Sequence, residues 1–147
     1  MAGLILTGLS LLAATVVIHA IGTTYWVRYL LRRYAAVDGQ FRQRTRIGVL
    51  ISSAIFLSCL HLAEVMLWAL GYRIVLPAGE LESLEAAFYF SAVTFTTLGY
   101  GDITLSSAWR LLSGIEAIDG ILLIGWSTAF MFAILQRTWG SLNEHKG

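Results

Sequence analysis

Three long apolar stretches dominate the pattern of hydrophobic and polar positions along the chain. The first covers about residues 3–27 without a charge, the second about 47–72 with one, and the third about 111–136 with two. A bilayer core takes about 20 mainly apolar residues per helix. The pattern therefore predicts three transmembrane helices, the first of which is too long for the apolar part of a signal peptide.

Between the second and third stretches lies a segment too long for a turn and too short for two further spans. Within it, three glutamates, Glu80, Glu82 and Glu85, precede the mainly apolar run 86–93. Acidic side chains near the start of a helix complement its positive end. The segment predicts a helix over about 82–95 and a return loop. Irregular backbone at membrane depth is tolerated only inside protein or beside water, so such a hairpin indicates a pore or cavity.

The composition supports a membrane protein. Hydrophobic residues make up 57% of the chain and charged residues 13%, whereas a soluble domain carries roughly 25% charged residues. The net charge of +1 gives no basic surface for nucleic acid. The single cysteine, Cys59, lies in an apolar run and is interpreted as a small buried hydrophobic residue.

Positive charges are distributed unequally between the predicted loops. Eight follow the first or the third span: Arg28, Arg32, Arg33, Arg42, Arg44, Arg46, Arg137 and Lys146. Two, Arg73 and Arg110, lie on the opposite side. Since cytoplasmic loops collect Lys and Arg, we expect the amino terminus outside, the carboxyl terminus in the cytoplasm and residues 73–110 facing outward.

Residues 94–102, Thr-Phe-Thr-Thr-Leu-Gly-Tyr-Gly-Asp, carry the most specific chemistry in the sequence. A dehydrated potassium ion needs oxygens in place of its water shell, and backbone carbonyls supply them where successive carbonyls point the same way. Extended L-residues alternate instead. Gly99 and Gly101 relieve this, because glycine adopts positive φ without a Cβ clash. Thr97 adds a hydroxyl group, and Tyr100 can point into the surrounding protein. Four such loops around one axis would form stacked ion sites.

This segment resembles the potassium channel signature T-x-x-T-x-G-Y-G-D, matched from Thr94 to Asp102. Aromatic residues over 88–90 and Trp109 also occupy positions where pore-domain relatives carry aromatics. The resemblance covers about residues 50–137. The full string between two spans is far more specific than Gly-Tyr-Gly alone.

The resemblance implies a selectivity filter and a set of residues that support it. The expected ion-binding residues are Thr97, Leu98, Gly99, Tyr100 and Gly101, with K⁺ at the first four. The expected supporting residues are Thr94, Thr96, Asp102 and Glu116. Two departures stand out at the partners of Asp102. Val93 and Phe90 replace a glutamate and a tryptophan that bond this aspartate in some bacterial relatives, so we expect Asp102 to lack both partners and slow inactivation to differ.

The third span contains candidates for a cavity and a gate. An ionisable residue inside a span is a functional candidate. By similarity to inward-rectifier channels, Asp119 is favoured as a charge lining the cavity, over a buried, hydrogen-bonded carboxyl group. Glu116 lies nearer the filter level. Gly120 or Gly125 matches the glycine hinge of relatives, and close helix packing by small residues is the equally weighted alternative.

Two histidines in the spans have modest interpretations. His61 and Glu64 lie three residues apart and share a helix face. They are interpreted as a hydrogen-bonded pair at a helix interface, not as a metal site, because no second pair of ligands is visible in the other spans. Proton sensing by His61 stays open. His19 in the first span is interpreted as a lone contact between helices.

The predicted fold is all-α: three transmembrane helices, a re-entrant pore helix and a filter loop per subunit. The expected parts are 1–46, an additional helix with a basic cytoplasmic loop; 47–137, the pore domain, with outer helix about 47–72, pore helix about 82–95, filter 97–102 and inner helix about 108–137; and 138–147, a short cytoplasmic tail.

The expected function is passive K⁺ conduction by a homotetramer in membrane lipid, with a bacterial plasma membrane as the expected location. No cofactor is expected apart from K⁺ as the permeant ion. A less selective cation channel is disfavoured by Tyr100. A potassium transporter subunit usually carries four filter-like loops with single glycines, whereas this chain has one loop with two. No nucleophile pattern or nucleotide loop suggests an enzyme.

Overall fold

The computed structural model describes residues 2–34 and 46–139. These residues contain four helices and no strand. They are α1, Ala2–Tyr34; α2, Arg46–Val75; α3, Leu84–Phe95; and α4, Arg110–Trp139. The all-α prediction is confirmed. Of the expected tail, Thr138 and Trp139 belong to α4. The rest of the tail and most of the basic loop, including Arg42, Arg44 and Lys146, lie outside the described residues.

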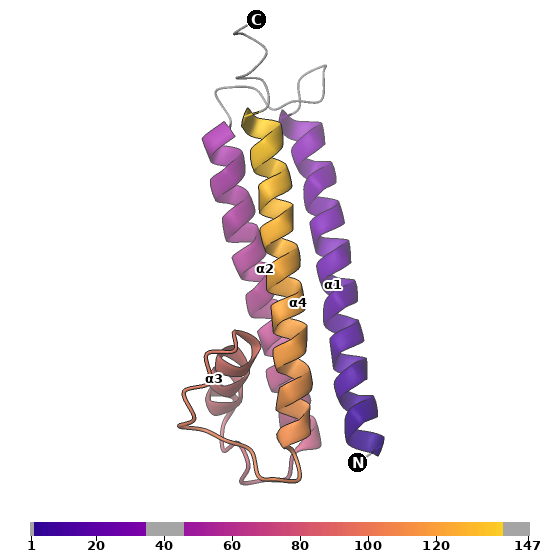
Figure 1. The fold of residues 1–147 in the computed structure, drawn as a ribbon, viewed down its shortest axis with the longest axis vertical. Coiled ribbons are helices and arrows are strands. Elements are labelled where there is room, and N and C mark those ends of the chain that lie inside the picture. Colours follow the sequence, from indigo (N-terminus) through magenta and orange to yellow (C-terminus); the bar gives the residue numbers. More distant parts are fainter. Residues whose placement is uncertain (1, 35–45, 140–147) are drawn as a thin grey trace, which may run out of the picture.

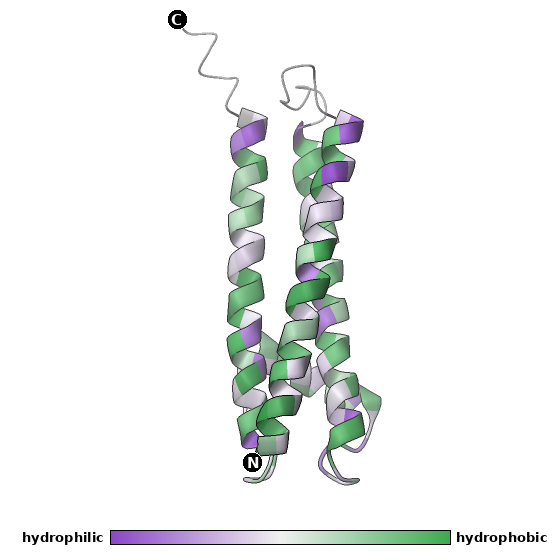
Figure 2. Ribbon diagram, turned by 90° about the vertical axis from the view of Figure 1, so that its right-hand side faces the viewer, coloured by the Kyte–Doolittle hydropathy of each residue, from purple (hydrophilic) through white to green (hydrophobic). Residues whose placement is uncertain are grey.

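The three long helices run side by side, and α3 lies at one end of the bundle against α2 and α4 (Figure 1). The amino terminus lies at this same end, so α1 runs from the α3 end to the opposite end. All three long helices are long and apolar enough to cross a membrane. In Figure 2 the middle of the long helices is coloured mainly as hydrophobic, with isolated hydrophilic positions.

Helix α3 begins where the sequence offers a cap. The Ser83 side chain accepts a hydrogen bond from the Ala86 amide at 3.0 Å, and Glu85 lies in the first turn. This satisfies one of the free amides at the helix start. The capping-box spacing is absent, yet the serine alone caps the helix, so α3 begins two residues after the expected position.

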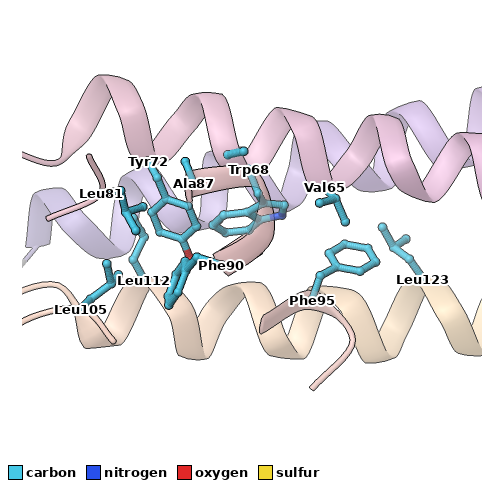
Figure 3. Packing of buried hydrophobic residues seen from close by; sticks show 11 residues of the cluster. Val65, Trp68, Tyr72, Leu81, Ala87, Phe90, Phe95, Leu105, Leu112 and Leu123 are labelled. Carbon is cyan, nitrogen blue, oxygen red and sulfur yellow. The ribbon is translucent and has the colours of Figure 1, made fainter. Parts of the chain in front are cut away.

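A cluster of large side chains fixes α3 between α2 and α4 (Figure 3). Trp68 and Tyr72 of α2, Phe95 of α3 and Leu112 and Leu123 of α4 are each at most 1% exposed. Between spans in lipid, such packing stabilises mainly through van der Waals contact, because the lipid is itself apolar. The orientation of the hairpin is therefore determined by how these buried side chains fit together.

Close approach at glycines joins α1 to the rest of the bundle. A Cβ on Gly8 would lie 2.6 Å from the Ile115 side chain of α4, and one on Gly71 of α2 would lie 2.7 Å from Leu11. Small residues of this kind let spans pack tightly. Helix α1 is thus an integral part of the subunit core.

Candidate functional site

The loop after α3 has a repeating backbone conformation. Positive φ occurs at every second residue: 57° at Thr97, 56° at Gly99 and 78° at Gly101. The two glycines adopt the conformation that the carbonyl argument requires. Thr97 was not expected to do so, because a left-handed conformation costs an L-residue about 1–2 kcal/mol. Such a residue persists only where its surroundings hold it.

Hydrogen bonds to the end of α3 hold this conformation. The Thr97 amide donates to the Thr94 carbonyl at 2.9 Å, and the amides of Leu98 and Gly99 donate to the Val93 carbonyl at 3.0 and 3.3 Å. The Thr96 hydroxyl donates to the Ala92 carbonyl at 2.7 Å.

Turning these amides back leaves the carbonyls of the loop free. Among the described residues, no hydrogen bond to a backbone carbonyl of residues 97–101 is found. The loop is exposed in the single subunit, and a carbonyl that further protein shields from water needs another partner. In this loop a cation is a suitable one.

The side chains of the loop are open in the single subunit. Leu98 is 54% and Tyr100 is 68% exposed. A cavity of about 590 Å³ lies behind the loop, between it and the first turns of α4. Its lining includes Tyr89, Val93, Thr97, Asp102, Arg110, Gly114 and Ala117. An irregular, exposed segment beside three spans requires cover by further protein if it lies at membrane depth.

Asp102 has a partner that the sequence comparison did not suggest. The Tyr89 hydroxyl donates to its Oδ2 at 2.7 Å from one turn into α3. Val93 and Phe90 offer no polar group, as expected, but Tyr89 takes their place. The hydrogen bond lowers the pKa of Asp102 below its ordinary value and raises the pKa of Tyr89.

A second carboxylate ties the outer loops together. Glu80 Oε2 accepts a hydrogen bond from the Ser106 amide at 3.0 Å. Hydrogen bonds from Ser106 lower the pKa of Glu80. The Arg73 guanidinium donates to the Leu81 carbonyl at 2.7 Å. Glu80 therefore connects the segment before α3 to the one before α4, and Arg73 connects α2 to the segment before α3. Both are charge-assisted bonds, which are stronger than neutral ones.

Glu116 is fully buried and joins three helices. Its Oε2 accepts from the Tyr72 hydroxyl of α2 at 2.5 Å, and its Oε1 contacts the Ser91 hydroxyl of α3. The Ser91 hydroxyl also lies 2.9 Å from the Val65 carbonyl. One hydroxyl hydrogen cannot serve two acceptors. If both Ser91 contacts are hydrogen bonds, the second proton belongs to Glu116.

Asp119 does not line a cavity, contrary to the expectation. Its side chain is fully buried inside the subunit, where Oδ2 accepts from the Thr15 hydroxyl at 2.7 Å and from the Trp68 indole at 2.8 Å. Helical spacing turns this residue toward α1 and α2. The alternative of a buried carboxyl group is correct, although its partners belong to the spans and not to the pore helix.

The two glycine candidates of α4 occupy different environments. A Cβ on Gly120 would lie 1.8 Å from the Phe95 carbonyl oxygen at the end of α3. Gly120 is therefore a close-packing position. Nothing lies within 4 Å of a Cβ on Gly125, which is exposed in the single subunit. Of the two glycines, only Gly125 therefore stays a candidate for the gating hinge.

The histidines form a cluster that the sequence interpretation missed. His61 Nδ1 lies 2.8 Å from Glu64 Oε2, which matches the expected pair, but His19 Nδ1 lies 2.8 Å from Glu64 Oε1. His19 is thus not a lone contact. The polar residues Thr15, His19 and Thr23, four apart on one face of α1 and all buried, are the signal that could have indicated it.

The segment that contains the loop and its neighbouring helices is similar to known proteins. Residues 46–137 match a family model described as "Ion channel", which covers α2, α3, the loop and nearly all of α4. No solved structure matches.

Three curated relatives are potassium channels by name. "Potassium channel subfamily T member 1" of Gallus gallus is 40% identical over 42% of this chain and 5% of its own length. "Voltage-gated potassium channel Kch" of Escherichia coli is 41% identical over 44% of this chain and 15% of its own. "Voltage-gated potassium channel regulatory subunit KCNG2" of Homo sapiens is 27% identical over 65% and 19%. The chain therefore spans less than a fifth of the length of each of these relatives.

Proposed function

The chain belongs to the ion channel family, and on that premise we propose that it is a subunit of a potassium-selective channel. As a member of this family it conducts ions and is not an enzyme. The proposed filter is Thr97, Leu98, Gly99, Tyr100 and Gly101, and K⁺ is the permeant ion, so no cofactor is required.

The observation that carries this proposal is the alternating backbone of residues 97–101. Positive φ at every second residue favours successive carbonyls turned toward one side, and the amides of residues 97–99 are bonded back to α3. The free carbonyls can then replace the hydration shell of K⁺. Helix α3 ends beside the filter, where the partial negative charge of its carboxyl end favours a cation.

Assembly of four identical subunits is part of the proposal. The exposed Leu98 and Tyr100 side chains and the open loop support it, because a loop at membrane depth requires surrounding protein. Four copies around one axis would bury these side chains and complete the ion sites.

The orientation proposed has the amino terminus outside and the carboxyl terminus in the cytoplasm. In support, α1 begins at the filter end, and the arginine-rich end of α1 lies at the opposite end. The proposed location is a bacterial plasma membrane, where the Escherichia coli relative gives one precedent for a similar sequence.

Flux through purified protein in liposomes tests the function. With K⁺ inside and Na⁺ outside, we expect a potential set by K⁺ and block by Ba²⁺. Equal permeation of Na⁺ would indicate the less selective channel, and uphill K⁺ uptake coupled to an ion gradient would indicate a transporter subunit. Absence of any K⁺ flux from a tetramer would overturn the proposal.

Gly99→Ala tests the filter itself. The added Cβ disfavours the φ of 56° by about 1–2 kcal/mol per subunit, so we expect K⁺ flux to fall at least tenfold. The matched control is Gly48→Ala in α2, where a Cβ meets nothing within 4 Å and φ is ordinary. If both variants conduct like the parent protein, residues 97–101 are not the filter.

A further inference from the structure

A polar cluster lies where α1, α2 and α4 meet, apart from the filter. His19 of α1 and Glu64 of α2 are fully buried, and the His61 side chain of α2 is 21% exposed. One potential ligand atom from each of the three residues can be chosen so that all lie within 4.8 Å of one another. Ser127 of α4, 8% exposed, completes the cluster.

Both imidazoles have the same orientation. Each Nδ1 lies 2.8 Å from a different oxygen of Glu64. Each Nε2 points to the Ser127 hydroxyl, at 2.8 Å from His61 and 3.4 Å from His19. The rings are stacked, with centroids 5.4 Å apart. The carboxylate thus lies at one edge of the pair and the hydroxyl at the other.

The number of hydrogen-bond donors in the cluster indicates whether it suits protons alone or a bound cation. If both histidines are neutral and donate from Nδ1 to Glu64, both Nε2 atoms need a donor, and Ser127 has one hydrogen. One buried nitrogen then lacks a partner unless a histidine is charged. If a cation instead lies between the Nδ1 atoms and the carboxylate, both Nε2–H groups can donate to the single Ser127 oxygen, which accepts two bonds.

We propose that His19, His61 and Glu64 form a binding site for a divalent transition-metal ion, with Zn²⁺ as the best match, and that Ser127 orients both imidazoles. Two imidazoles and one carboxylate are a known zinc ligand set that leaves a fourth position open. A second-shell acceptor on the outer nitrogen of each ligating histidine is the usual arrangement.

The geometry requires only side-chain adjustment. Ligands about 2.1 Å from a tetrahedral ion lie roughly 3.4 Å from one another. The two nitrogen–oxygen contacts of 2.8 Å are shorter than this, so each must lengthen by about 0.6 Å when the ion binds. His61 is the partly exposed member of the site.

The site connects the first span to the pore unit. His61 also contacts the Phe95 ring at the end of α3, at 5.9 Å between centroids. An ion bound by His19 and His61 would tie α1 to α2 beside the inner end of the pore helix. Any effect of this ion on K⁺ flux rests on the proposed function, whereas the binding itself does not.

Metal binding is measured on the purified full chain in detergent, with His145→Gln as the background to remove the histidine near the carboxyl end. Equilibrium dialysis with Zn²⁺ is expected to give one ion per chain, and Co²⁺ is expected to give the visible spectrum of a four-coordinate site with imidazole ligands. His61→Gln and Glu64→Gln are each expected to weaken Zn²⁺ binding at least a hundredfold.

Ser127→Ala distinguishes an orienting role and keeps the test valid if a ligand variant does not fold. It is expected to weaken Zn²⁺ binding about tenfold to a hundredfold, while Ser58→Ala, an exposed serine of α2, leaves it unchanged. Absence of stoichiometric Zn²⁺ binding, or binding that survives both His61→Gln and Glu64→Gln, would overturn the proposal. Neither outcome depends on K⁺ flux.

Discussion

Hydrogen bonds at the two ends of the filter loop hold the conformation of its first residue and the side chain of its last. Thr97 is held at positive φ by the carbonyls that close α3, and Asp102 is held by the Tyr89 hydroxyl. Both contacts come from the same short helix. The loop therefore depends on α3 at its beginning and at its end.

Tyr89→Phe removes the hydroxyl that stabilises ionised Asp102. The native state holds the pKa of Asp102 below that of an unfolded aspartate, about 3.9. Its stabilisation is complete above the unfolded value and is lost as pH falls through the native value. We expect the pKa of Asp102 to rise in the variant, as measured by carbon NMR of the aspartate carboxyl groups. Tyr25→Phe, which alters an exposed tyrosine of α1, is the control. An unchanged titration of Asp102 would refute the contact.

Glu116 should tolerate an amide but not a deletion. In Glu116→Gln the amide can donate to Ser91 while its oxygen accepts from Tyr72, so both bonds persist. Glu116→Ala leaves the buried Tyr72 hydroxyl unpaired at about 1–3 kcal/mol, whereas Ser91 keeps the Val65 carbonyl. We expect thermal unfolding in detergent to be lowered strongly by alanine and little by glutamine. Equal losses in the two variants would show that the carboxylate charge itself is needed.

The helices are positioned by close contacts as much as by hydrophobic faces. Helix α3 is only twelve residues long, too short to be stable alone in water. Its place depends on Phe90 and Phe95 in the core and on the Ser91 hydroxyl bonded to α2 and α4. The absence of a side chain at Gly120 lets α4 pack directly against the Phe95 backbone at the end of α3.

Gly120→Ala tests this contact. The Cβ would lie 1.8 Å from a backbone oxygen, which cannot rotate away, so we expect a loss of about 3 kcal/mol or more in the stability of the folded chain. Gly125→Ala, where the Cβ is free, should leave the unfolding temperature of the detergent-solubilised subunit within a few degrees of the parent. Equal stability of both variants would contradict the packing interpretation of Gly120.

At the scale of the whole molecule, one end of the subunit holds the filter and the amino terminus, and the other holds the basic end of α1 (Figure 1). The spans bury polar groups against one another, and many large apolar side chains are exposed on the single subunit. This arrangement suits lipid on the outside and further subunits around the exposed filter.

Cysteine accessibility measures the orientation. In a Cys59→Ser background, Gly3→Cys lies near the filter end and Gln136→Cys lies near the opposite end of α4; both positions are exposed. With a membrane-impermeant thiol reagent on intact cells, we expect labelling of Gly3→Cys alone, and of Gln136→Cys only after permeabilisation. The reverse pattern would invert the proposed topology.

The three spans, the short helix and the filter segment could be predicted because each depends on local information. Apolar length indicates a span whatever its neighbours are, and Gly99 and Gly101 at alternate positions indicate where carbonyls can align. The helix ends were less predictable: α1 continues to Tyr34, well past the expected end near residue 27, because arginines at a span's end extend to the interface without ending the helix.

Apart from the pair His61 and Glu64 on one helix, only the tertiary structure decided which buried polar groups meet. Asp119 and Glu116 lie three residues apart on one helix, yet one faces α1 and α2 and the other faces α2 and α3. His19 reaches Glu64 across 45 positions of sequence. Periodicity shows which residues share a face of a helix, but which helix covers that face follows from packing between spans.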